Sequence, residues 1–120
     1  FVVEGEVRNE EDKPISFVLL EGRLLSTDNQ PVQAQRSFAG NVMTRDELTQ
    51  LSVTDIQNRM MNREGKDLRN VHVPPQGKVP FMVVFHNLPE IERLGDYEVV
   101  VVSAQFEKAA PAVPEKAQKN

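Results

Sequence analysis

Two histidines, His72 and His86, have the side chains best suited to act as a general base or to bind a metal ion. The chain has no cysteine, so a metal site would have to combine a histidine with carboxylates from distant segments. No pair of such ligands stands at a recognised spacing. We therefore expect both histidines to be structural or exposed, and the sequence predicts no metal ion and no cofactor.

Serine and carboxylate chemistry are also poorly supported. The five serines fall in predicted strands, turns or helix caps, and none occupies a nucleophile elbow. The acidic residues between Glu4 and Asp12 could pair for acid–base catalysis or bind calcium. Because this segment has no Asp/Asn/Gly calcium loop, a solvated strand face and turn is favoured. We predict no catalytic residue and a protein that is not an enzyme.

The best candidate for a binding surface is a group of methionines and arginines. Met60 and Met61 lie between Arg59 and Arg63. Methionine adapts to irregular surfaces, and arginine is enriched at protein interfaces. We add Met82, which lies on the second face of an apolar strand, and take all five as a candidate partner or pocket surface. The alternative, which we favour for Met60, is core packing of a helix.

Composition excludes some partners. The 120 residues have a formal charge of −4, and Lys and Arg do not cluster, so no basic patch is available for nucleic acid. No apolar stretch reaches the roughly 20 residues that cross a bilayer, and no signal-peptide pattern is present. The length suits one domain. Since the chain opens at Phe1 inside a strand pattern, we expect a domain of a longer protein, with any membrane anchor upstream.

Alternating apolar residues predict a mainly β domain over residues 1–106. Polar residues before Pro31 predict a hairpin turn. Leu24 and Leu25 break the alternation around Gly22, which predicts a bulge in the second strand. Residues 107–120, rich in Pro, Ala and Lys, are predicted to form a disordered tail. The five predicted strands are residues Phe1 to Asn9, the segment from Ile15, Val32 to Phe38, Val79 to Phe85, and Tyr97 to Phe106.

A helical insertion is predicted at about residues 44–64. Thr44 and Glu47 form a capping box, and Thr54 with Gln57 is a second start signal. Gly65 can end the helix in a left-handed conformation. We therefore expect one bent helix or two short ones in this segment.

The last two predicted strands are apolar on both faces, which is unusual in an antiparallel sheet. Val83 and Val84, for example, point to opposite faces, and so do Val101 and Val102. The helical insertion is the nearest cover, through apolar residues that include Met60 and Met61. A partner protein or an upstream segment is the alternative cover.

The order of these segments resembles a proteobacterial domain of unknown function that follows a zinc-ribbon finger and a single transmembrane helix. The resemblance covers about residues 1 to 106 and is most specific from Pro74 to Phe85. Its other parts are the Val3–Asn9 strand, Leu24-Leu25, Ala39-Gly40, Asp46-Glu47-Leu48 and Tyr97-Glu98-Val99.

This resemblance implies an immunoglobulin-like antiparallel β-sandwich on the extracytoplasmic, periplasmic side of the bacterial inner membrane. It implies no catalytic residue, and the finger and the transmembrane helix are not among these 120 residues. We expect a non-enzymatic interaction or structural module of a membrane-anchored envelope protein, with an unknown protein partner. The alternative is a small-molecule or lipid carrier with an apolar pocket under the helical insertion.

Overall fold

Residues 1–86, 88 and 94–106 are described by a computed structural model of the chain, and the predicted tail at 107–120 lies outside them. The predicted mainly β class is confirmed. In the described residues the helices are α1 (Arg45–Gln50), α2 (Val53–Met60) and a 3-10 turn η1 (Lys66–Leu68). The strands there are β1 (Val2–Arg8), β2 (Ile15–Ser26), β3 (Pro31–Phe38), β4 (Lys78–Val84) and β5 (Leu94–Phe106).

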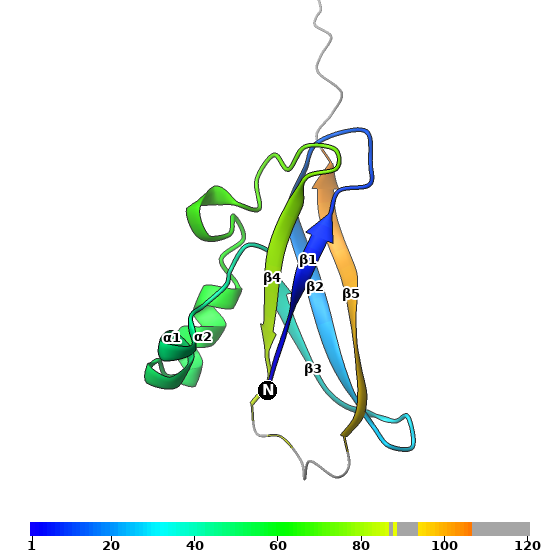
Figure 1. The fold of residues 1–120 in the computed structure, drawn as a ribbon, viewed down its shortest axis with the longest axis vertical. Coiled ribbons are helices and arrows are strands. Elements are labelled where there is room, and N and C mark those ends of the chain that lie inside the picture. Colours follow the sequence, from blue (N-terminus) through cyan, green and yellow to red (C-terminus); the bar gives the residue numbers. More distant parts are fainter. Residues whose placement is uncertain (87, 89–93, 107–120) are drawn as a thin grey trace, which may run out of the picture.

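The strands form two antiparallel sheets (Figure 1). β1 pairs with β4 in one sheet, and β2 lies between β3 and β5 in the other. The predicted hairpin joins β2 to β3, where Asn29 adopts a φ of 65° and the Gln30 N–H donates to Ser26 Oγ at 3.1 Å. Asparagine tolerates this left-handed conformation better than most residues, which explains the turn.

One buried cluster joins the facing sides of the two sheets. β4 contributes Phe81 and Val83, and β2 contributes Leu20 and Leu24. At Gly22, an added Cβ would lie 2.9 Å from Val83 Cγ1, closer than real side-chain contacts. Glycine is therefore needed at this position because the two sheets approach closely there.

The irregularity predicted around Gly22, where Leu24 and Leu25 break the alternation, lies between these two leucines and not at the glycine itself. The β2–β3 register shifts between Leu24 and Leu25, and the β2–β5 register shifts near Phe17. Phe17 has a φ of 56°, which bulky residues rarely adopt. The strand irregularities therefore flank Gly22, whose role is close packing.

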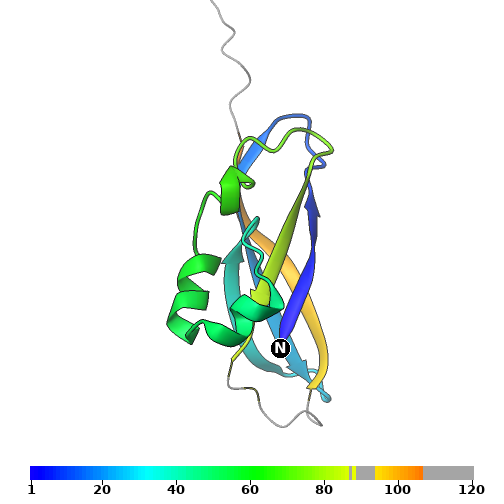
Figure 2. The same cartoon turned by 60° about the vertical axis from the view of Figure 1, so that its left-hand side comes forward.

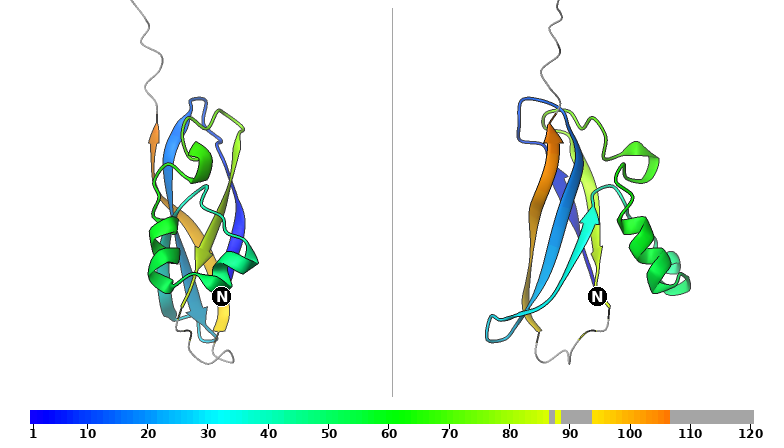
Figure 3. Two further views of the ribbon diagram at one scale, coloured as in Figure 1. Left: turned by 90° about the vertical axis from the view of Figure 1, so that its left-hand side faces the viewer. Right: turned by 180° about the vertical axis from the view of Figure 1, so that it is seen from behind.

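A second buried cluster covers the outer face of β4, as the insertion was predicted to do. Met82 is 2% exposed and packs with Met43, Ile56 and Met60. Figure 3 shows the helices as a layer in front of the strands, separate from the two sheets. The two apolar faces of β4 are thus buried on two different sides of the same strand.

The start of α1 is confirmed, and the start of α2 differs from the prediction. Thr44 and Glu47 form both bonds of the capping box, at 2.9 and 3.1 Å. Ser52, not Thr54, is the N-cap of α2, and its Oγ accepts a hydrogen bond from the backbone N–H of Asp55 at 3.1 Å. α2 ends at Met60, so Gly65, at a φ of 75°, lies in the following loop and is not its stop.

The prediction that the last strand is buried on both faces is wrong. Tyr97, Val99 and Val101 pair with inner-face residues of β2, yet Tyr97 is 51% and Val101 55% exposed. Among the described strands β5 lies at the edge of its sheet, and the facing sheet has fewer strands than its own. The helices lie on the side of the molecule away from β5 (Figures 1 and 2), so they cannot cover it.

Candidate interaction surfaces

The neighbouring methionines of α2 have different environments. Met60 is 4% exposed, lies against Met82 of β4, and its Sδ accepts a hydrogen bond from Ser37 Oγ at 3.4 Å. Met61 follows the end of the helix and is 48% exposed. Met60 and Met82 therefore attach α2 to the sheet, and Met61 lies at the surface.

A hollow of about 420 Å³ lies beside one face of α2. Val42 and Met43 line it with apolar surface, and Arg59 and Lys66 add positive charge. Arg59 also forms an ion pair with Glu47 at 2.6 Å. The backbone N–H of the helix N-cap residue, and after it Arg59, lower the pKa of Glu47. This hollow is suited to a ligand with an apolar part and a negative charge.

A smaller hollow of about 250 Å³ lies on the other side of α2, lined by residues that include Met61 and His86. The Gln33 amide nitrogen donates to the backbone oxygen of His86 at 2.8 Å. Gln33 Oε1 and His86 Nε2 are buried without a hydrogen-bond partner among the described residues. Both atoms could accept a hydrogen bond from a small hydroxyl-bearing molecule or from water.

Arg63 points to a different neighbour. Its guanidinium carbon lies 4.2 Å from the centroid of the Phe17 ring, which is a cation–π contact with β2. Arg59 and Met61 line separate hollows. The five predicted residues are therefore not brought together in one surface.

A strip of exposed apolar side chains runs along β5, and sequence reasoning missed it. We call these four residues the β5 strip: Tyr97 (51% exposed), Val101 (55%), Val102 (39%) and Phe106 (53%). Phe1 is itself half exposed, and the centroid of its ring lies 6.3 Å from that of the Tyr97 ring, so it extends the apolar surface. The sequence offered no signal for this exposure, because alternating valines and aromatics are equally typical of a buried strand.

The edge of β5 that pairs with no described strand lacks the usual protection of edge strands. Such edges are normally blunted by lysine, proline or inward charges. β5 has no lysine, arginine or proline, and its only charges are Asp96 and Glu98 near its start. Glu98 accepts a hydrogen bond from Arg23 at 3.2 Å, which offsets its charge. The β3 edge of the same sheet, in contrast, contains Pro31 and Arg36.

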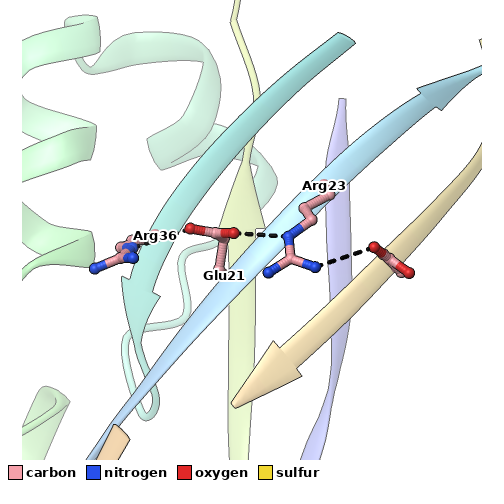
Figure 4. A network of polar contacts seen from close by, with 4 residues as sticks. Glu21, Arg23 and Arg36 are labelled. Atoms are coloured by element: carbon pink, nitrogen blue, oxygen red, sulfur yellow. Dashed lines mark hydrogen bonds and ion pairs between the residues drawn. The ribbon is translucent and has the colours of Figure 1, made fainter. Parts of the chain in front are cut away.

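The outer face of this sheet has a charged network (Figure 4). Glu21 accepts from Arg23 at 2.7 Å and from Arg36 at 3.0 Å, and Arg23 also bonds Glu98. Hydrogen bonds from Arg23 and then from Arg36 lower the pKa of Glu21. Hydrogen bonds to Glu21 and then to Glu98 raise the pKa of Arg23. This face is polar and its charges are paired, so it offers less apolar contact area than the β5 strip.

His72 and His86 do not form a metal centre with acidic neighbours. The His72 backbone N–H donates to Ser16 Oγ at 2.8 Å. Residues 1–86, 88 and 94–106 contain no group of three or more His, Asp or Glu side chains that could hold a metal ion.

No described helix has the length and apolar content that crossing a bilayer requires. Comparisons of the chain with protein-family models, with curated proteins and with solved structures gave no match.

Proposed function

We propose that this domain is a non-enzymatic interaction or structural module of a bacterial envelope protein, and that it binds its partner through β5. The observation that supports this is the β5 strip, in which Tyr97 and Val101 lie on the inner face of a sheet and are still half exposed. Adding a strand to a free sheet edge is a common mode of recognition, in which backbone hydrogen bonds give affinity and side chains give specificity.

The finer fold assignment, an immunoglobulin-like β-sandwich, is part of the same proposal. The orders β3-β2-β5 and β1-β4 correspond to strands C′-C-F and B-E of that fold. In an immunoglobulin domain strand G pairs with F, the counterpart of β5. Within the described residues no strand takes the place of G. The proposed partner strand would occupy that place.

The proposed location is the periplasmic side of the inner membrane, with membrane attachment only through an anchor upstream of this domain. It rests on the resemblance of the segment from Pro74 to Phe85 and of the strands around it. Fusing the full-length gene product to a reporter that is active only outside the cytoplasm tests it. Reporter activity confined to the cytoplasm would contradict the location and leave the binding proposal in place.

Affinity capture from envelope extracts tests the interaction. The bait is the chain itself, and the test variant is Val101→Lys, which places a charge in the β5 strip. The matched control is Val32→Lys on the other edge strand of the same sheet, where the side chain is 37% exposed. We expect a partner that the wild type and the Val32 variant retain and the Val101 variant loses. Equal capture by all three proteins would refute binding through β5.

The second candidate function is a carrier for a small amphiphile, and the hollow of about 420 Å³ beside α2 favours it. Met60 and Met82 fill part of the space between α2 and β4, so a ligand of this size would bind in the hollow beside the helix. Titration with dodecanoate, followed by calorimetry, tests this function. A carrier should bind it and should lose affinity in Arg59→Gln, whereas absence of heat in the wild type at two well-separated temperatures would exclude this ligand class.

A further inference from the structure

We propose that the partner strand is β5 of a second copy of this chain, paired antiparallel to the first. The inference rests on the proposed function, because it names the occupant of the same edge. β5 is 13 residues long and pairs only with β2 among the described residues. It therefore presents an edge about 40 Å long at roughly 3.3 Å per residue. In the pair, the sheets of both copies would join into one continuous sheet.

The regular part of β5 sets the register. The β2–β5 pairing is uninterrupted from Asp96 to Val101, and the next partner of β2 is Ser103, so Val102 is an extra residue. Pairing centred on Val99 uses this regular part in both copies. A residue that precedes Val99 by a given number of positions then lies opposite the residue that follows Val99 by the same number in the other copy.

This register places the two exposed inner-face residues against each other. Tyr97 of one copy lies opposite Val101 of the other, on both sides of the central Val99 pair. Aromatic and β-branched residues are favourable cross-strand partners. Since Tyr97 and Val101 are each about half exposed in the single chain, the pairing removes from water the residues that the two sheets leave uncovered.

Charge also favours the antiparallel arrangement. In this register Glu98 lies opposite Val100, and Asp96 lies at the end of the regular pairs, next to the extra residue Val102 of the other copy. No acidic residue faces another acidic residue across the pair, whereas a parallel pairing in register would align both acids with their copies. The asymmetric placement of charge at one end of β5 is thus compatible with self-pairing.

The other edges fit a second copy less well. Antiparallel self-pairing of β1 about Gly5 would set Glu4 opposite Glu6, a like-charge pair. The β3 edge begins with Pro31, which has no N–H to donate. The edge of β4 remote from β1 is partly used, because its Pro80 oxygen accepts the Gly40 N–H at 2.7 Å.

Sedimentation velocity over a concentration series tests the pairing. We expect the wild-type chain to form dimers at high concentration and Val101→Lys to weaken association at least tenfold. Val32→Lys on the opposite edge should associate as the wild type does. A wild type that stays monomeric throughout, or dimers that Val101→Lys does not weaken, would overturn the inference.

Cysteine cross-linking tests the register, since the native chain has no cysteine. Val99→Cys places the two thiols at the centre of the pair, with Cα atoms about 5 Å apart and within disulfide reach. In Val101→Cys the equivalent Cα atoms would be about 13 Å apart, too far for a disulfide. Oxidation should therefore give covalent dimers of the Val99 variant at least tenfold faster. Equal cross-linking of both variants would refute this register.

Failure of the inference can be separated from failure of the proposed function. A chain that is monomeric and still captures an envelope protein through Val101 would overturn self-pairing and leave binding through β5 intact. A chain that neither dimerises nor captures a partner in a manner sensitive to Val101 would overturn both.

Discussion

At the scale of single residues, two buried asparagines fix the loops that connect the layers. Asn70 is fully buried, and its side chain bonds both the N–H and the oxygen of Val18. The Asn41 side chain donates to the backbone oxygens of Met60 and Asn62, at the point where α2 ends. A helix stop that depends on a residue far upstream leaves no local signal, and Gly65 is the nearest residue whose type predicts a stop.

Removing the Asn70 side chain should be costly. Asn70→Ala removes the partner of the buried Val18 N–H, whereas the Val18 oxygen keeps the hydrogen bond from the Ala39 N–H at 2.9 Å, and we expect a loss of about 2 kcal/mol in the free energy of unfolding. Urea denaturation followed by circular dichroism measures this loss. The control is Asn62→Ala, whose side chain is exposed, and it should change the value by less than about 0.5 kcal/mol. Similar losses in the two variants would contradict the role of Asn70.

The charged network predicts a dependence of stability on pH. The pKa of Glu21 is lowered in the folded state, so its stabilising effect is complete above its ordinary value of 4.5 and is lost as pH falls through the lowered value. Glu21→Gln should therefore melt at a lower temperature than the wild type at neutral pH, and the difference should vanish in strong acid. Thermal melts across this range measure it. A difference that does not change with pH would contradict the ionic origin.

At the scale of elements, the sequence predicted most features that depend only on residues close together in the chain. The capping box at Thr44 and the alternation in β4 are signals within a few residues, and both were confirmed. Ser52 was missed as an N-cap because Thr54 offers the same chemistry two residues later. The exposure of Val101 was missed because it depends on which strands lie beside and above β5, and strand order is not a local property.

The candidate surface was predicted less well than the fold for the same reason. Met60 and Met61 are adjacent in the sequence, but the side of the helix on which the sheet lies decides which of them is buried. The β5 strip consists of valines and aromatics that are typical of core strands. Among the described residues, its place at the edge of its sheet and the smaller number of strands in the facing sheet distinguish it from a core strand.

The attachment of α2 to β4 makes a prediction that uses adjacent residues. Met60→Ala would leave a cavity against Met82, and we expect a loss of about 3 kcal/mol in unfolding free energy. Met61→Ala alters an exposed side chain and should change it by less than about 0.5 kcal/mol. Chemical denaturation of both variants measures this contrast. Equal effects would mean that Met60 does not anchor the helix.

At the scale of the whole molecule, the helical layer depends on the sheets for its stability more than the sheets depend on the helices. The cluster between the sheets contains Leu20 and Val83, whereas α2 is held by the separate cluster around Met60. α1 and α2 have six and eight residues, and isolated helices of that length are not stable in water. The helical layer therefore needs the sheet beneath it, while the inter-sheet cluster includes no residue of α1 or α2.

This inequality predicts the order in which the layers open. Native-state hydrogen exchange should show that the amides of α2 exchange by local opening, at a lower free energy than those of β2, which pairs on both sides. In dilute denaturant, Met60→Ala should abolish the protection of the α2 amides from exchange. The amides of β2 should keep theirs. Exchange of α2 and β2 at one common free energy, in the wild type and the variant alike, would show instead that all layers unfold as a single cooperative unit.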